Sequence, residues 1–340
     1  MIKNKYLIFI LLFFSNIAFA QSVEDKRTSS ASNKTLVSKN LKISVDKNSG
    51  NFIFYAKENA EDNDKNKDSE EWIKILSEKT IPSSYFIFLK DGTSIGYGSG
   101  EKGVHTCQIK WNEIKYAWEN ANTRIISTFS FAQNMDTSTY DGFNINLNIK
   151  NISKADIELI PIACFDGNND TLEEHYFTSN RRISVEQELL GSNIKDSITI
   201  NTMIPHTSLK LFVPEIINTA AQENKRIRPK RVFFTNWRRM KDYESGTFFV
   251  NSGRRFDTEP YSDNDSALFI EFPNTKIKPN SSILINFRLN IEKLKISASS
   301  QARLDELFQL LKEVNQKIDA NEIVEKKYLN DLDDRLNALR

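Results

Sequence analysis

Alternation of apolar and polar side chains constrains the fold of this chain more than any other feature. It is clearest in the segment YDGFNINLNIKNIS, residues 140–153. The apolar positions there are Phe143, Ile145, Leu147 and Ile149, and they alternate with Asn144, Asn146, Asn148 and Lys150. Successive side chains of a strand point to opposite faces of a sheet, and an antiparallel sheet with one wet face requires this pattern. We therefore interpret the asparagine row as the solvated face of a strand.

Short runs of the same kind recur along the chain, separated by turn signals such as Asn48-Ser49-Gly50 and Asp91-Gly92. The expected strands are residues 41–45, 51–55, 85–90, 106–111, 114–119, 123–131, 143–151, 157–164, 198–202, 209–213, 246–250, 267–272 and 283–291. Many strands without long intervening helices predict a mainly β protein, a large sandwich of antiparallel sheets over residues 41–296.

Two stretches interrupt the pattern. Residues 57–71 are charged and almost without apolar side chains, which is typical of a long solvated loop. Residues 214–231 open with a proline, which indicates a helix-like turn, and then become basic.

The first 20 residues predict an export signal. Lys3 and Lys5 precede an apolar run over residues 6–14, and Ala18 and Ala20 occupy the positions that a signal peptidase reads. That run is too short to span a membrane, which takes about 20 residues. Gln21 follows the expected cleavage point, so no cysteine is available there for a lipid anchor. We expect a periplasmic or secreted protein without a transmembrane segment after cleavage.

Residues 21–40 are polar and aperiodic, which predicts a flexible leader. The formal net charge of the whole chain is +1, so its overall field favours neither polyanions nor polycations. We expect no nucleic-acid partner.

The two cysteines, Cys107 and Cys164, allow a disulfide in an oxidising compartment. The alternative is a pair of small apolar side chains buried in strands. Neither has a histidine partner in a recognisable catalytic motif.

Several motif-like segments favour plain structural interpretations. GSGEKG, residues 98–103, precedes a predicted strand rather than a helix, which favours a turn over a dinucleotide-binding loop. DGNND, residues 166–170, lacks the glycine and the glutamate of a calcium loop. The three histidines, at 105, 175 and 206, are scattered, so we expect neither a metal nor a cofactor.

A basic segment with interleaved aromatic residues is the strongest local anomaly. Such segments can bind anionic polymers or glycans. The candidate interaction residues are Arg226, Arg228, Lys230, Arg231, Trp237, Arg238 and Arg239. The alternative is a hairpin or helix with its aromatic side chains in the core and its charges compensated by Asp257, Glu259, Asp263 and Asp265.

Residues 297–340 change to a helical period and predict a coiled-coil tail. The expected oligomerisation seam is Leu304, Leu307, Leu311, Val314 and Ile318. A lone helix cannot bury such a stripe, so self-association through the tail is expected, with docking onto the same chain and binding to a different partner as the alternatives.

Two phrases, residues 140–167 and 264–291, followed by the helical tail, resemble exported envelope proteins of spirochaetes. The resemblance implies an envelope location and transfers no functional residue. We therefore expect a non-catalytic envelope scaffold or assembly protein, whose partner is another envelope protein or an anionic envelope polymer. The alternative is a glycan-binding or glycan-active sandwich, by analogy with large sandwiches that carry exposed aromatic side chains.

Overall fold

The computed structural model describes residues 33–57, 72–76, 82–133, 139–167, 176–178, 181–202, 207–218, 226–239, 249–256, 258 and 266–293. The predicted signal sequence and the predicted coiled-coil seam lie outside these residues, and so do His175, His206 and the four acidic residues expected to compensate the basic segment. The chain divides into two compact units, Met1–Glu292 and Lys293–Arg340. The strands below form the first unit.

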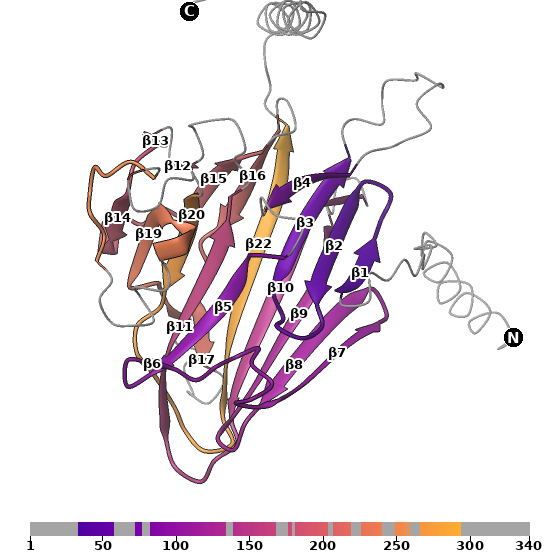
Figure 1. The fold of residues 1–340 in the computed structure, drawn as a ribbon, viewed down its shortest axis with the longest axis vertical. Coiled ribbons are helices and arrows are strands. Elements are labelled where there is room, and N and C mark those ends of the chain that lie inside the picture. Colours follow the sequence, from indigo (N-terminus) through magenta and orange to yellow (C-terminus); the bar gives the residue numbers. More distant parts are fainter. Residues whose placement is uncertain are drawn as a thin grey trace, which may run out of the picture. The chain divides into compact units, whose positions relative to one another are not determined.

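Three antiparallel sheets make up this unit (Figure 1). The smallest has the consecutive order β1 (Asn33–Val37), β2 (Leu41–Asp46), β3 (Phe52–Lys57) and β4 (Trp72–Leu76).

The largest sheet has eleven strands. Its path runs β13 (Arg181–Ile183), β12 (Tyr176–Thr178), β15 (Ser197–Asn201), β16 (Thr207–Phe212), β22 (Ser282–Lys293), β10 (Tyr140–Asn151), β9 (Thr123–Gln133), β8 (Glu113–Glu119) and β7 (Val104–Lys110). Beside this path, β17 (Ile216–Asn218) pairs with β22 and with β18 (Arg226–Ile227). The eleven-stranded sheet therefore joins segments that span residues 104–293.

The third sheet has seven strands. Its path runs β14 (Gln187–Leu190), β19 (Arg231–Asn236), β20 (Ser266–Glu271), β11 (Ile157–Asp166), β5 (Tyr85–Lys90) and β6 (Thr93–Ser94), with β21 (Thr275–Ile277) pairing to β11. The helical segments of the described residues are two three-residue turns, η1 (Gly191–Asn193) and η2 (Trp237–Arg239). In this part of the chain no helix has the length and hydropathy to cross a membrane.

Aromatic rings hold the sheets face to face. Phe54 of β3 stacks on Phe143 of β10, with ring centroids 4.2 Å apart. Phe52, also on β3, contacts Phe129 of the eleven-stranded sheet at 5.2 Å and Phe86 of the seven-stranded sheet at 5.6 Å. Fully burying a phenylalanine side chain stabilises a fold by about 1.5–3 kcal/mol. These ring contacts therefore stabilise the junction of the three sheets.

The alternation in residues 140–153 is confirmed. Phe143, Ile145, Leu147 and Ile149 are fully buried, whereas Asn146 is exposed. β10 lies between β9 and β22, and all three place their apolar face toward the core. The expected mainly antiparallel β-sandwich is therefore confirmed for the described residues.

Three sequence predictions need correction. Residues 33–37 of the expected flexible leader form β1, because Leu36 is buried and the strand pairs with β2 along its whole length. Residues 216–218 form β17 rather than a helix-like turn, because Ile216 is buried opposite Ile285 of β22. Phe249 and Val250, at the end of the strand predicted over residues 246–250, lie outside the sheets, and the Phe249 carbonyl accepts a hydrogen bond from Arg239 instead.

Candidate functional site

The tip of the β7–β8 hairpin carries an unusual residue. Lys110 pairs with Glu113, so the turn consists of Trp111 and Asn112. Trp111 has a φ of 55°, and its side chain is 84% exposed. A bulky residue in the left-handed region costs on the order of 1–3 kcal/mol, and glycine or asparagine is preferred at such a turn. A strained, solvated indole suggests that function rather than stability accounts for tryptophan here.

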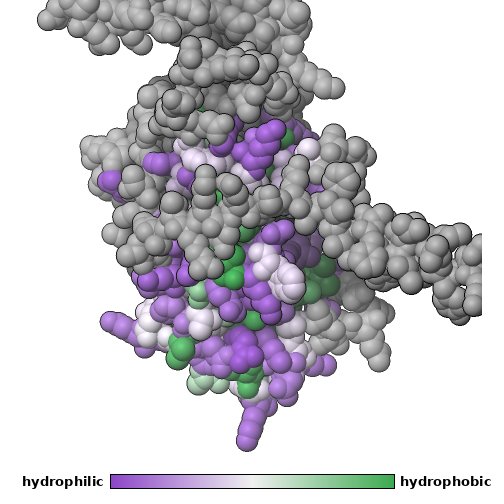
Figure 2. Space-filling view, turned by 90° about the vertical axis from the view of Figure 1, so that its right-hand side faces the viewer, coloured by the Kyte–Doolittle hydropathy of each residue, from purple (hydrophilic) through white to green (hydrophobic). Residues whose placement is uncertain are grey.

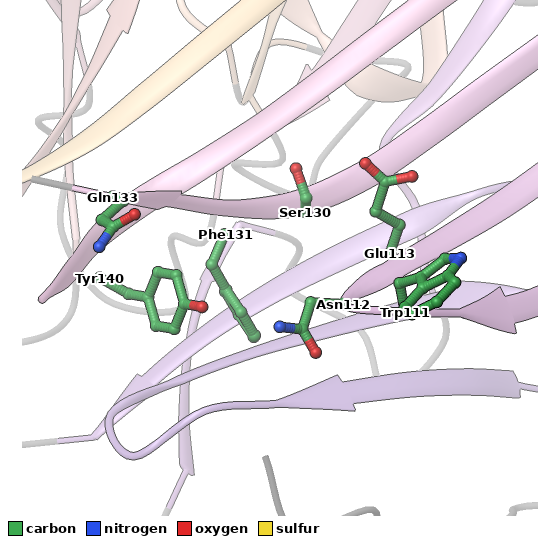
Figure 3. Close-up of a pocket in the computed structure, with 7 residues that line it drawn as sticks. All are labelled: Trp111, Asn112, Glu113, Ser130, Phe131, Gln133 and Tyr140. Atoms are coloured by element: carbon green, nitrogen blue, oxygen red, sulfur yellow. The ribbon is translucent and has the colours of Figure 1, made fainter. Parts of the chain in front are cut away.

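Strand β9 runs past this hairpin and leaves a notch beside the tip. The β8–β9 pairing reaches Ser130, opposite Glu113, whereas the β9–β10 pairing continues to Gln133, opposite Tyr140. An open pocket of about 460 Å³ occupies the notch (Figure 3). Its lining consists of Trp111, Asn112, Glu113, Ser130, Phe131, Gln133 and Tyr140.

The pocket has an aromatic part and a polar part. The rings of Phe131 and Tyr140 lie on one side of β9, with centroids 5.3 Å apart, while Ser130 and Glu113 point to the other side (Figure 3). Asn112 lies between the tyrosine–phenylalanine pair and Trp111 (Figure 3). A ligand in this notch would thus meet flat apolar rings, amides and one carboxylate within a small space.

The polar part continues onto the outer face of the eleven-stranded sheet. Glu113, Ser130, Asn144 and Arg288 occupy directly opposed positions across four neighbouring strands. The next row consists of Lys115, Thr128, Asn146 and Asn286. The asparagine row of residues 140–153 is therefore the solvated face, as predicted, and it adjoins the pocket.

A β-bulge interrupts β10 beside the pocket. The β9–β10 register shifts between Tyr140 and Gly142, so Asp141 has no position in the ladder. Only glycine fits at position 142, because an added Cβ would clash with the Leu289 carbonyl oxygen and lie 2.9 Å from Asn290 Cα. One carboxylate oxygen of Asp141 is buried and accepts no hydrogen bond from the described residues. Bulges often re-aim side chains next to functional sites.

A second open pocket, of about 730 Å³, lies at the opposite end of β8. Its lining is Lys102, Gly103, Val104, His105, Thr106, Ala117, Glu119, Asn120, Ala121 and Arg124. Glu119 forms an ion pair with Arg124. Glu119 follows Glu113 by six positions along β8, so the two pockets mark the ends of a polar strip roughly 20 Å long.

The predicted basic segment does not form one cationic surface. Its charges are distributed over ion pairs with acidic residues of other strands and loops. The pairs are Arg226–Glu215 at 3.7 Å, Arg228–Asp196 at 3.1 Å, Lys230–Glu271 at 3.1 Å, Arg231–Glu271 at 2.6 Å and Arg231–Glu188 at 2.8 Å. The geometry matches the alternative of compensated charges, with partners that differ from the acidic residues expected from the sequence.

The end of this segment belongs to the core. Arg239 forms a buried ion pair with Glu186, and Arg238 donates its backbone N–H to the Asn236 side chain at 2.9 Å. Trp237 donates its indole N–H to the Ser83 carbonyl at 3.1 Å and packs edge-on against Tyr85. These interactions give the side chains of Trp237 and Arg239 structural roles, whereas Arg238 is exposed and contributes its backbone N–H.

The cysteines are not joined by a disulfide. Cys107 is half-buried on β7 and Cys164 is buried on β11, in different sheets. Burial raises the pKa of the Cys107 thiol to about 11, which leaves little thiolate at neutral pH. The alternative of a buried apolar side chain therefore holds for Cys164, whereas Cys107 is only half-buried.

Two of the motif-like features, GSGEKG and His105, lie within the described residues, whereas residues 168–170 of DGNND lie outside them. Residues 98–103 form a turn between β6 and β7, so the prediction for GSGEKG is confirmed. His105 stacks on Tyr116 with centroids 5.9 Å apart. Among the described residues no three histidine, cysteine, aspartate or glutamate side chains converge to hold a metal ion.

Sequence reasoning missed the site at the hairpin tip. The predicted strand over residues 106–111 included Trp111, and no role was assigned to Asn112, Glu113 or Tyr140. A signal was present: KWNE joins two alternating runs, and it places a tryptophan where turn residues usually lie.

The fold and the pocket together define a class: an antiparallel β-sandwich protein with an aromatic, amide-lined pocket at the edge of its largest sheet. No protein-family model and no curated protein sequence matches the chain.

Solved structures that are similar to the chain include a putative aldose 1-epimerase from Escherichia coli K12, at 12% identity and a TM-score of 0.45, covering 77% of this chain and 99% of that one. A galactose mutarotase-related enzyme from Lactobacillus acidophilus has 7% identity and a TM-score of 0.44, with coverages of 77% and 98%. A galactose mutarotase-like protein from Lactobacillus casei has 8% identity and a TM-score of 0.45, with coverages of 76% and 100%. Similarity at this level assigns no activity to this chain.

Proposed function

We propose that this is an exported glycan-binding protein that uses the pocket at the tip of the β7–β8 hairpin. The observation that carries the proposal is Trp111, whose indole is 84% exposed on a left-handed turn backbone beside Asn112 and Glu113. The export part rests on residues 1–20, which have the charge, apolar run and small residues of a cleavable signal.

Carbohydrates fit the chemistry of this pocket. A pyranose ring has an apolar face of C–H bonds, which packs on flat aromatic rings such as that of Trp111. Its hydroxyl groups both donate and accept hydrogen bonds, and the amides of Asn112 and Gln133 and the carboxylate of Glu113 offer matching partners. Pockets for small ligands combine an apolar lining with a few polar groups in this way.

We propose binding rather than hydrolysis of a glycosidic bond, because one carboxylate lines the pocket, whereas Asp141, in the bulge beside it, has a carboxylate oxygen buried away from the pocket lining. Hydrolysis uses two carboxyl groups about 5–9.5 Å apart. Glu113 is the one carboxylate among the described residues that line the pocket, and Glu119, at the other end of β8, forms an ion pair with Arg124. A rise of about 20 Å along the strand separates the two glutamates.

The test is a binding screen with neutral and acidic oligosaccharides, followed by calorimetric titration of the best ligand. Trp111→Ala should weaken binding at least tenfold, because a central aromatic contact is worth at least about 1.4 kcal/mol. Phe249→Ala, which removes an exposed aromatic side chain that does not line the pocket, should leave affinity unchanged. Equal affinity in the two variants, or no oligosaccharide binding by the wild type, would refute the proposal.

A second candidate is a non-catalytic scaffold or assembly protein of the cell envelope. The observation that favours it is the unpaired edge strand β7, whose exposed apolar side chains suit contact with another protein chain. Cross-linking in intact cells, followed by mass spectrometry of partners attached to β7, would distinguish a scaffold from a protein that contacts glycans alone.

A further inference from the structure

Strand β7 is the longest edge strand among the described residues. It forms one end of the eleven-stranded sheet and has seven residues, whereas β13 at the other end has three. The outer strands of the four-stranded sheet, β1 and β4, have five each, and those of the seven-stranded sheet, β14 and β6, have four and two. A long edge presents a row of unpaired backbone groups that can pair with another chain.

The hairpin register determines which backbone groups face outward. Lys110 and Glu113 close a two-residue turn, so they form a hydrogen-bonded pair, and every second residue of β7 repeats that arrangement toward β8. The backbone groups of the residues between them point away from the sheet; these residues are His105, Cys107 and Ile109. No described residue forms a backbone hydrogen bond with these outward groups.

The usual protections of an edge strand are absent from β7. Its sequence, VHTCQIK, has no proline, its register with β8 has no bulge, and its one permanent charge lies at the last residue. By contrast, β13 carries two arginines in three residues. Val104 is 76% exposed and Ile109 is 38% exposed, with Trp111 following the strand. Figure 2 views the side on which β7 lies in Figure 1 and shows hydrophobic residues exposed there among hydrophilic ones.

We propose that β7 pairs antiparallel with β7 of a second copy of this chain, about a twofold axis at Cys107. This register pairs all seven residues of both strands, which no other register achieves. It joins Val104 to Lys110, His105 to Ile109, Thr106 to Gln108, and Cys107 to the same residue of the other copy. The three outward-facing residues of one strand lie opposite those of the other copy, so every outward N–H and C=O forms a hydrogen bond between the two strands.

The strand is self-complementary in this register. No two like charges lie opposite each other, since Lys110 meets Val104 and the remaining residues are uncharged or histidine. Beyond the paired residues, Trp111 of each copy would lie next to Gly103 of the other. Gly103 and Val104 line the larger pocket, so the second copy would contribute an indole to it. The inference does not depend on glycan binding.

Cross-linking of the full-length mature chain tests the pairing directly. A short bifunctional maleimide should join two copies through Cys107, because directly opposed residues of antiparallel strands have Cβ atoms about 5 Å apart. Cys164→Ser should retain the covalent dimer, whereas Cys107→Ser should abolish it, because Cys164 is buried on β11. The reaction is slow, because burial raises the pKa of Cys107, so it is followed by mass spectrometry until Cys107 is fully modified. Full modification without a covalent dimer in the wild type would overturn the proposal.

A charge test then checks the register. Thr106→Lys combined with Gln108→Lys places lysine opposite lysine twice across the axis, and should reduce cross-linking at least tenfold. Thr106→Glu combined with Gln108→Lys places opposite charges at the same positions, and should cross-link as well as the wild type. Circular dichroism verifies that both variants are folded. Equal cross-linking of the two double variants would contradict the proposed register.

Discussion

The buried ion pair between Glu186 and Arg239 offers a quantitative test of how the segment after η2 is held. Both side chains are buried, and the Glu186 carboxylate also accepts hydrogen bonds from Thr235 Oγ1 at 2.9 Å and from the Asn251 N–H at 3.1 Å. Arg239 donates a further bond to the Phe249 carbonyl at 2.9 Å. The pair thus connects β19 and η2 to the chain around residue 250.

Removing one partner should be costly, because it leaves the other charge buried without compensation. We expect Glu186→Gln or Arg239→Met to lower the free energy of unfolding by about 3–5 kcal/mol. Replacing both together should cost clearly less than the sum of the two, since no uncompensated charge then remains, and the coupling free energy should be at least about 2 kcal/mol.

Urea denaturation followed by tryptophan fluorescence measures these free energies. Arg226→Met is the matched control, since Arg226 makes a 3.7 Å ion pair on the surface and its loss should cost no more than about 1 kcal/mol. Additive effects of the two core substitutions, or single losses no larger than that of the control, would refute a role for the buried pair in stability.

Three further predictions concern β10, the cysteines and one lysine. Gly142→Ala should lower the free energy of unfolding by about 1–3 kcal/mol, because the new Cβ meets the β22 backbone, whereas Gly100→Ala, whose nearest atom would be 3.7 Å away, should have little effect; urea denaturation measures both. Cys107 of the folded protein should react slowly with a thiol reagent at pH 7, because burial raises its pKa to about 11. In urea both thiols should react, and the absence of reactive thiols there would indicate a disulfide instead. Burial lowers the pKa of Lys42 from 10.5 to about 8, so the unfolded chain binds more protons between those values, and the stability contributed by this position should rise with pH across that window. Comparing urea denaturation of the wild type and Lys42→Met at pH 7 and 9.5 tests this, and an identical pH dependence in both would contradict it.

The sequence predicts the strands whose two faces meet different environments. β10 and β22 are examples, because one face of each is fully buried and the other polar, so period-two alternation marks them. β5 was also predicted within its observed bounds, Tyr85–Lys90, although four of its six residues are buried. Its run of aromatic and branched side chains ends at the turn signal Asp91-Gly92, and that boundary makes the strand recognisable in the sequence.

Strands held by tertiary pairing alone are not predictable in this way. β1 has one buried side chain, Leu36, and β18 has two residues, so neither carries a recognisable period. β19 is not predicted from the sequence, because the basic residues Lys230 and Arg231 at its start are typical of a solvated segment. In the structure both form ion pairs with the buried carboxylate of Glu271. Ion-pair partners 40 residues apart in the chain depend on sheet order, which alternation does not encode.

The candidate site depends even more on sheet order than the strands do. Its pocket exists because β9 pairs with β8 only as far as Ser130 and with β10 as far as Gln133, and a difference in strand overlap leaves no trace in hydrophobic periodicity. The same β7–β8 hairpin supplies both the exposed Trp111 and the unpaired edge of the sheet.

If β7 pairs with a second copy, two outer faces become one surface, with the polar strips of the two copies side by side and each Trp111 next to the partner's larger pocket. A multivalent glycan that contacts both copies would then bind more tightly to the dimer than to either half, because the second contact is intramolecular. The double-lysine variant should therefore lose affinity for long oligosaccharides while keeping that for short ones, and equal losses for both lengths would show that pairing and binding are independent.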